Sequence, residues 1–225
     1  MRVSKKSPYL LRTFGIPEEE LKGYKYQKWI GGIDLYLESE EEKKEAIQRF
    51  GEFVYAEDMV EMEEAVVRLL ERKGLKLATA ESCTGGLLSA RIVNVEGCSK
   101  VFLGGFVAYS NELKIRLLGV EESLLEKFGA VSEEVCRAMC IGALEKTDAD
   151  ISVAITGIAG PTGGTPQKPV GLTYIGIGTD SEVIVKRYHL EGTRNENRFL
   201  ATQIALDMLR RYVNGKDTSN GYNKP

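Results

Sequence analysis

The stretch ATAESCTGGLLSARI, residues 78–92, decides the fold of this chain. With the preceding LKL it begins as a short apolar run, which predicts a buried strand, and its end, GGLLSARI, predicts a helix. Between the two stand a glutamate, a serine, a cysteine and a threonine, followed by two glycines. Reactive and hydrogen-bonding side chains in a row make a poor packing motif, so we expect chemistry at this strand-to-helix turn.

Strands and helices alternate along the chain around this turn. The sequence predicts helix MEEAVVRLLERKG, strand LKLATA, helix GGLLSARIVNV, strand KVFLGGFVAYS, helices NELKIRLLG, EESLLEKFG and SEEVCRAMCIGALEKT, strand DISVAITGIAG, hairpin VGLTYIGIGTDSEVIVKRYHLEG and helix RNENRFLATQIALDMLRRYV. This order predicts an α/β fold, a three-layer α/β/α domain with a mixed sheet over residues 58–213. Residues 214–225, NGKDTSNGYNKP, are expected to be a disordered tail.

Residues 1–57 are predicted to form a small N-terminal α+β domain. SPYLLRTFG and PEEELK are predicted to be helical, KWIGGIDLYLES to be a strand, EEEKKEAIQRFG a helix and EFVYAED a short return strand. Within the strand, Ile33, Leu35 and Leu37 alternate with polar residues, which is typical of a half-exposed strand.

The composition is that of an ordinary soluble globular protein, with 43% hydrophobic and 28% charged residues among 225. A net charge of −3 argues against a protein that mainly neutralises nucleic-acid phosphates. No apolar run approaches the roughly 18 residues of a membrane span, and the basic N-terminus has no apolar signal core. We therefore expect a cytoplasmic protein with no membrane partner.

The four cysteines are too few and too scattered for a disulfide framework. Cys136 and Cys140 lie one helical turn apart, but no second pair and no nearby histidine completes a metal site. We expect no metal, and buried apolar packing for this pair.

Three predicted strands end in unusual residues, at 81–86, 109–114 and 156–164. Ligands of such sheets collect at the carboxyl ends of strands, so these segments are predicted to line one site. The last of them, within TGIAGPTGGTPQKPVG, could cradle a phosphate with its backbone donors or only shape a turn. Arg194 and Arg198 could clamp a phosphate, or equally decorate an exposed helix.

The single histidine limits the choice of a catalytic base. His189 lies inside a predicted hairpin strand, so we expect it to be half-buried or on the surface and not part of a triad. A desolvated lysine is the obvious substitute. Lys114 follows a strand end by about one helical turn, whereas Lys76 and Lys100 precede their strands and belong to the opposite edge.

The nucleophile is less sharply defined by the residues alone. Ser82 and Cys83 point to opposite faces of an extended segment, so they cannot easily share one role. Ser82 and Thr84 could also be helix N-caps. Gly85 and Gly86 allow a ligand to approach the backbone, and donors at a helix start suit an oxyanion or a phosphate equally well.

AESCTGG, FLGGFVAYSNELKIRLLGV, GAVSEEV, TGIAGPTGGTPQKPVG and GTR stand in the order and spacing of a known family. From about residue 60 to 212 the chain resembles the CinA C-terminal family, also called the nicotinamide-nucleotide amidase (PncC) family. LRTFGI and FGEFVYAED within residues 1–57 resemble the KH-like middle domain of full-length CinA, in shortened form. The molybdopterin-binding-like domain of full-length CinA has no counterpart in this sequence, and we expect no pyrophosphatase activity from it.

The resemblance implies hydrolysis of the carboxamide of nicotinamide mononucleotide to nicotinate mononucleotide and ammonia, without a cofactor. It implies Ser82 as nucleophile and Lys114 as base, with Tyr109 either orienting the lysine or stacking on the substrate. Residues assigned to the substrate are Glu81 (a counter-charge to the pyridinium, or paired locally), Cys83, Thr84 and Gly85 (the oxyanion), and Asn111, Thr156, Gly157, Ala159, Gly160 and Arg194. The family often has an acid where this chain has Thr193, which leaves the orientation of Arg194 open.

The resemblance also implies a homodimer. Three alternatives stay open: a cysteine hydrolase that uses Cys83, a non-catalytic nucleotide-binding protein linked to competence or DNA damage, and a nucleic-acid-binding protein. The last is not expected, because WIGGIDL lacks a GxxG loop with basic flanks.

Overall fold

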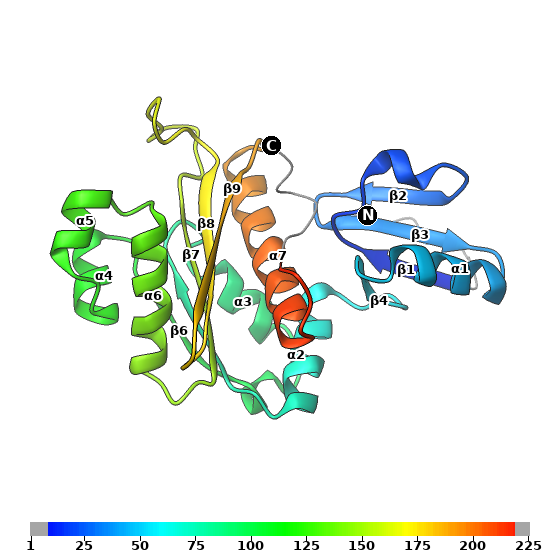
Figure 1. The fold of residues 1–225 in the computed structure, drawn as a ribbon, viewed down its shortest axis with the longest axis horizontal. Helices are drawn as coiled ribbons and strands as arrows, with labels where there is room; N and C mark the ends of the chain where they lie inside the picture. Colours follow the sequence, from blue (N-terminus) through cyan, green and yellow to red (C-terminus); the bar gives the residue numbers. More distant parts are fainter. Residues whose placement is uncertain (1–8, 219–225) are drawn as a thin grey trace.

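The computed structural model describes residues 9–218 of the chain, which form two sheets and their helices (Figure 1). The strands of the larger sheet are β5 (Leu77–Glu81), β6 (Phe102–Val107), β7 (Ile151–Gly157), β8 (Leu172–Gly178) and β9 (Val183–His189). They lie in the order β6-β5-β7-β8-β9. β5 pairs in parallel with β6 and β7, whereas β8 is antiparallel to both β7 and β9. The mixed sheet and its closing hairpin are as predicted.

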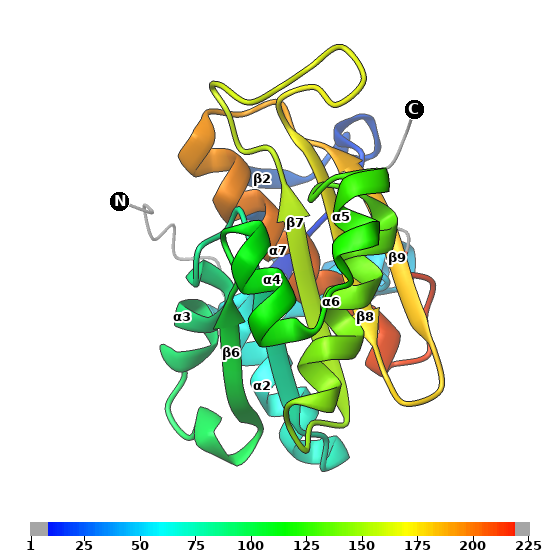
Figure 2. The ribbon, with the colours of Figure 1, turned by 90° about the vertical axis from the view of Figure 1, so that its left-hand side faces the viewer.

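Helices cover both faces of this sheet. One face carries α2 (Met62–Lys73), α3 (Leu87–Val93) and α7 (Arg194–Val213). The other, seen in Figure 2, carries α4 (Asn111–Leu118), α5 (Glu122–Phe128) and α6 (Glu133–Glu145). β5 shows the alternation that builds these layers, because Leu77 belongs to the first core and Ala78 and Ala80 to the second. The predicted three-layer α/β/α architecture is confirmed.

A smaller antiparallel sheet forms the N-terminal α+β domain. Its elements are β1 (Tyr9–Thr13), the 3₁₀ helix η1 (Glu18–Leu21), β2 (Lys25–Trp29), β3 (Gly32–Leu37), α1 (Glu40–Phe50) and β4 (Val54–Ala56), with strand order β2-β3-β1-β4. A second 3₁₀ turn, η2 (Cys98–Lys100), lies in the larger domain. Leu11, Leu35 and Phe50 are fully buried in the core of the small domain.

Two predictions for this domain were wrong. The segment expected to be helical is strand β1 over Tyr9–Thr13, paired with β3. Its alternation was hidden because Arg12 is buried, where it bonds to Asp34 (3.2 Å) and to the Val60 carbonyl (2.9 Å). KWIGGIDLYLES, expected to be a strand, crosses a hairpin: it contains the end of β2 and all of β3, with the turn at 30–31, so the glycines mark a turn and not a strand interior.

Helix α7 lies between the two sheets and joins them (Figure 1). Gln203 Nε2 donates to the Gly31 carbonyl at the tip of the β2–β3 hairpin, 2.7 Å away. Arg210 donates to the carbonyls of Val54 and Glu52, each at 3.0 Å. Both side chains are buried, so the small domain packs on the larger one through specific polar contacts.

The chain continues past α7 to Thr218, which is buried. The rest of the expected tail, 219–225, and the start of the first predicted helix, 1–8, lie outside the described residues. Within residues 9–218, none of the helices combines the length and apolarity that a membrane crossing needs.

Candidate active site

Ser82 lies at the carboxyl edge of the larger sheet. It follows β5 directly, and its N–H donates to the Ile155 carbonyl of β7 at 2.9 Å, which continues the strand pairing by one residue. Only 8% of Ser82 is exposed. Gly85 and Gly86 then turn the chain into α3 with φ of 59° and 89°, a left-handed conformation that favours glycine.

The helix begins without a capping serine or threonine. Gly86 is the N-cap of α3, and no side chain caps from that position. The alternative role of Ser82 and Thr84 as N-caps is therefore excluded. The Thr84 hydroxyl is buried, and no described residue bonds to it.

Glu81 supplies the missing cap and is not available to a substrate. Its carboxylate is fully buried and accepts hydrogen bonds from the N–H groups of Leu88 (3.0 Å) and Ser89 (2.8 Å) and from the Ser89 hydroxyl (2.7 Å). A negative charge is stabilised at a helix N-terminus by the N–H groups and the helix dipole. Of the two roles considered for Glu81, pairing with local donors is the correct one, and the counter-charge role was wrong.

Lys114 reaches Ser82 from α4. The Ser110 hydroxyl caps this helix by accepting from the Leu113 N–H. One turn in, Lys114 Nζ lies 3.0 Å from Ser82 Oγ, the contact that the sequence predicted. The amine also donates to the carbonyls of Ala108 (2.8 Å) and Tyr109 (3.3 Å).

The environment of Lys114 makes its amine a usable base. The side chain is 1% exposed, and desolvation by burial lowers its pKa to about 8, with a smaller opposing effect of Cys83. Carbonyl oxygens surround the amine in place of carboxylates, so its acceptors are neutral. Such a lysine exchanges its proton near neutral pH.

Tyr109 contributes through both its main chain and its side chain. Its carbonyl accepts from Lys114, whereas its ring is 59% exposed and its hydroxyl accepts from Arg194 at 3.2 Å. Arg194, at the start of α7, also donates to the Gly160 carbonyl at 2.8 Å. These two contacts orient Arg194, while Thr193, which stands where the family often has an acid, forms a capping box with Glu196 at this helix start.

The end of β7 and the segment after it are fixed by their neighbours. Thr156 donates its hydroxyl to the Ala130 carbonyl at 2.8 Å, and a side chain at Gly157 would clash with the Thr173 hydroxyl. The Ala159 carbonyl accepts from Asn197 at 3.1 Å. Residues 161–167 are exposed, and after them Lys168 donates to the Val131 carbonyl at 2.8 Å. The three predicted strand ends thus meet at one edge.

Three further residues considered in the sequence do not contact the Lys114 amine through a hydrogen bond. Burial raises the pKa of the partly buried Cys83 thiol to about 12, so it is a neutral thiol at physiological pH. His189 is exposed at the end of β9. Asn111 begins α4 and is exposed, which leaves its amide open to a ligand.

Sequence reasoning missed the carbonyls of Ala108 and Tyr109, Asn197, and the actual contact of Arg198. Arg198 NH2 donates to the Thr84 carbonyl at 2.8 Å and so holds the loop that follows Ser82. Its spacing of four from Arg194 places both on one face of α7 and was the available signal. The carbonyls of Ala108 and Tyr109 could not be predicted, because every residue has a main-chain carbonyl and the residue type does not show which one accepts a hydrogen bond.

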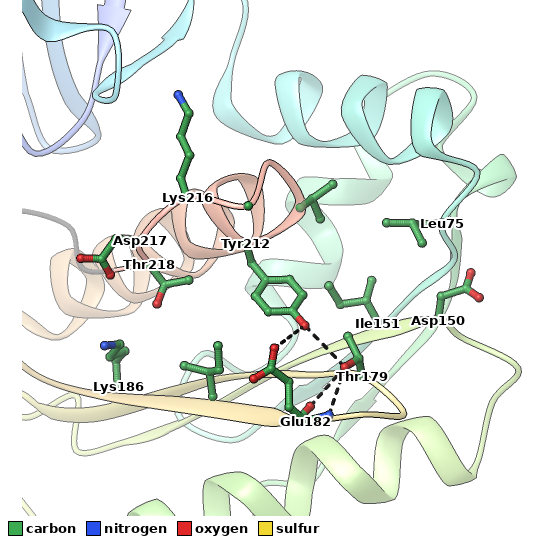
Figure 3. A pocket seen from close by; sticks show the side chains of 13 residues that line it. Leu75, Asp150, Ile151, Thr179, Glu182, Lys186, Tyr212, Lys216, Asp217 and Thr218 are labelled. Carbon is green, nitrogen blue, oxygen red and sulfur yellow. Dashed lines mark hydrogen bonds between the residues drawn. The ribbon is translucent and has the colours of Figure 1, made fainter.

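A cavity of about 750 Å³ lies at the opposite edge of the sheet (Figure 3). It is lined by residues before β5 and β7, by the turn of the β8–β9 hairpin and by the end of α7, with Tyr212 bonded to Glu182 at 3.0 Å in its middle. The cavity is therefore separate from Ser82.

Among residues 9–218, no three histidine, cysteine or acidic side chains are grouped to hold a metal ion.

The chain is thus an α/β protein whose three-layer α/β/α domain places a serine hydroxyl next to a buried lysine at the edge of its sheet. Residues 59–213 match the CinA C-terminal domain, and the chain belongs to that family. A CinA-like protein from Kosmotoga olearia is 50% identical over 169 residues, which cover 75% of this chain and 41% of that protein. One from Sulfurihydrogenibium is 43% identical and covers 95% of this chain and 57% of that protein.

Solved structures agree with the fold. A CinA superfamily protein from Escherichia coli is 35% identical with a TM-score of 0.64, covering 66% of this chain and 87% of that one. The competence/damage inducible protein CihA from Agrobacterium tumefaciens is 36% identical with a TM-score of 0.64, covering 71% and 99%. The chain spans about two fifths of the length of the first curated relatives it matches.

Proposed function

We propose that this chain hydrolyses the carboxamide of nicotinamide mononucleotide, releasing nicotinate mononucleotide and ammonia. The observation that carries the proposal is the 3.0 Å contact between Lys114 Nζ and Ser82 Oγ, with a lysine pKa of about 8. A nucleophile hydrogen-bonded to a base of suitable pKa is the minimal apparatus of acyl transfer. The substrate itself is implied by the family resemblance.

The first step transfers a proton and forms a bond. Neutral Lys114 takes the Ser82 hydroxyl proton while Oγ attacks the amide carbon. The carbonyls of Ala108 and Tyr109 hold the amine in place during the transfer. The pyridinium ring of the substrate withdraws electrons from the amide and makes its carbon more susceptible to attack.

The oxyanion then needs donors. Within residues 9–218, the N–H groups of Cys83 and Thr84 donate to no other residue, whereas the Gly85 N–H already donates to the Ser82 carbonyl at 3.1 Å. The expected set of three donors is therefore reduced to two. A preorganised donor of this kind contributes about 3 kcal/mol to the transition state.

The remaining steps regenerate the enzyme. The Lys114 ammonium gives its proton to the departing nitrogen as the C–N bond breaks, and ammonia leaves. Lys114 then takes a proton from a water whose oxygen attacks the ester carbon on Ser82. As the ester C–O bond breaks, the Lys114 ammonium returns this proton to Ser82 Oγ, so nicotinate mononucleotide leaves and the free hydroxyl and neutral amine are restored. Arg194, the exposed Asn111 and the segment after β7 are our candidates for the ribose-phosphate end.

The test is ammonia release from nicotinamide mononucleotide by the wild type, Ser82→Ala and Lys114→Met, with folding checked by circular dichroism. Ser123→Ala and Lys127→Met on α5 serve as matched controls. We expect both site variants to lose at least about a thousandfold in kcat, and both controls to keep wild-type turnover. Thiol alkylation should leave activity largely intact, since Cys83 is not the nucleophile.

Normal turnover in Ser82→Ala would disprove the proposal. Binding of nicotinamide mononucleotide by the wild type with no ammonia release would favour the second candidate, a nucleotide-binding module. Free nicotinamide, which lacks the ribose-phosphate, should be a poor substrate, and equal rates on both amides would disprove recognition of the nucleotide.

A further inference from the structure

Arg198 makes an unusual contact for a residue on a long helix. It lies in the second turn of α7 and is only partly exposed. Its NH2 group donates to the Thr84 carbonyl at 2.8 Å, across the gap between α7 and the catalytic loop. The guanidinium also lies against Gly85, where an added Cβ would be 3.7 Å from NH2.

This contact fixes one peptide unit from both sides. The Thr84 carbonyl accepts from Arg198 and from the Leu87 N–H at 3.2 Å. On the other side of the same peptide, the Gly85 N–H donates to the Ser82 carbonyl. Both polar atoms of the unit are engaged, so the peptide cannot rotate without breaking hydrogen bonds.

The two preceding N–H groups take their direction from this fixed unit. Those of Cys83 and Thr84 donate to no main-chain carbonyl in the described part of the chain, and the Cys83 N–H faces only the thiol of its own residue. They follow the nucleophile directly in the sequence, which is where donors to an oxyanion are needed. The positive charge of Arg198 also reaches the loop: burial is the main influence on the pKa of Cys83, and Arg198 acts against it by favouring the thiolate.

We propose that Arg198 is a positioning residue for acyl transfer: by holding the Thr84 carbonyl, it aims the N–H groups of Cys83 and Thr84 at the developing oxyanion. The inference rests on the proposed function in so far as Ser82 is the nucleophile. It assigns Arg198 to the reacting end of the site and not to a substrate phosphate. The loop donors act only on the transition state, so loss of Arg198 lowers kcat and leaves KM nearly unchanged.

The experiment compares Arg198→Met and Arg198→Lys with Arg68→Met, a substitution of an exposed arginine on α2 that forms an ion pair with Glu64. The first readout is kcat and KM for nicotinamide mononucleotide. The second is the rate at which an alkyl fluorophosphonate labels Ser82, followed by intact mass. In that reaction Ser82 Oγ bonds to phosphorus, the P–F bond breaks, fluoride leaves and Lys114 takes the hydroxyl proton.

We expect Arg198→Met to lose about 10- to 100-fold in both kcat and labelling rate, since small misplacements of catalytic groups have effects of this size. Arg198→Lys keeps the charge and one donor and should fall between Met and wild type. Arg68→Met should match the wild type in both readouts. Thermal unfolding of each variant shows whether it is folded at the assay temperature.

Other results would overturn the inference. A raised KM with unchanged kcat would assign Arg198 to the substrate. Wild-type rates in Arg198→Met would mean that the hydrogen bond to the Thr84 carbonyl has no part in the reaction. A lowered melting temperature with an unchanged labelling rate would mean a purely structural role. If the wild type is labelled but releases no ammonia, the proposed function fails while the labelling rates still decide on Arg198. If the wild type is not labelled and releases no ammonia, both the proposed function and the role of Arg198 are disproved.

Discussion

Burial of Lys114 has two effects on its amine. Desolvation lowers the pKa to about 8, and the carbonyls of Ala108 and Tyr109 together with the Ser82 hydroxyl fix its position. A surface lysine would be almost fully protonated at neutral pH and unable to accept a proton. The same residue type becomes a base through its surroundings.

The lowered pKa predicts how activity depends on pH. Only the neutral amine accepts the Ser82 proton, and the neutral fraction grows as pH rises toward the pKa of about 8. We expect kcat/KM for nicotinamide mononucleotide to rise about tenfold per unit from pH 6 to near 8 and then to level off. A stopped assay of ammonia over pH 6–10 measures this. A flat profile, or one that falls across this range, would contradict a lysine base.

Sequence reasoning from the residues alone led to Lys114, because the one histidine lies inside a strand and this lysine lies a turn beyond a strand end. It left the choice between Ser82 and Cys83 open, and only the family resemblance implied Ser82. Glu81 was misassigned because the sequence does not show whether the side chain of a glutamate next to Ser82 faces the substrate or the N-terminus of a helix. Its geometry depends on where α3 begins, and the N-cap is Gly86, later in the chain than the capping candidates Ser82 and Thr84.

Among the elements, α3 depends on a carboxylate from the preceding strand. Glu81 ends β5 and holds the first turn of α3. The loop that carries Ser82 is thereby tied at both ends by one side chain. The position of Ser82 and the stability of α3 are thus coupled.

This coupling predicts the effect of Glu81→Gln. The amide keeps one acceptor oxygen but directs its NH₂ group at a helix N–H, which leaves a buried donor without an acceptor. We expect a loss of about 2 kcal/mol in the free energy of unfolding, together with a lower kcat at temperatures where the protein is folded. Urea unfolding and ammonia release measure the two effects. Glu122→Gln in the exposed first turn of α5 is the matched control and should change neither. Full activity in Glu81→Gln would contradict the coupling.

The helices and strands of the larger domain were predictable because their hydrophobic periods are regular and their ends carry glycine or capping residues. Strand β1 was not, because the buried Arg12 interrupts the apolar pattern and finds its partners, Asp34 and Val60, far along the chain. The hairpin of β2 and β3 was missed because Gly31 and Gly32 were taken as part of a strand. The first error comes from contacts that no local window contains, whereas the second is a misread turn signal that lies within the local sequence.

At the scale of the whole molecule, α7 connects the small domain to the sheet edge that carries Ser82 and Lys114. Its first two turns hold Gly160, Tyr109 and Thr84 through Arg194 and Arg198. Farther along the same helix, Gln203 and Arg210 hold the small domain. We therefore expect both domains to unfold in one cooperative transition.

Arg210→Met tests this connection. It removes the donors to the Val54 and Glu52 carbonyls and takes one of two arginines from the buried Asp207. Leaving such groups unpaired costs about 3 kcal/mol, so the melting temperature should fall by several degrees. Differential scanning calorimetry provides the measurement, with the exposed Arg72→Met on α2 as control. Two well-separated transitions in the wild type would contradict a single cooperative unit.

The exposed stretch 161–167 is anchored on either side by Gly160 and Lys168 yet contributes none of the contacts that hold Ser82 or the base. Insertions or substitutions in this stretch can change which ligand binds next to Ser82 while the contact between Ser82 and Lys114 stays the same. Mutations in different parts of the gene can thus change ligand specificity and the Ser82–Lys114 pair separately. The fold can therefore evolve new specificities without first losing its activity.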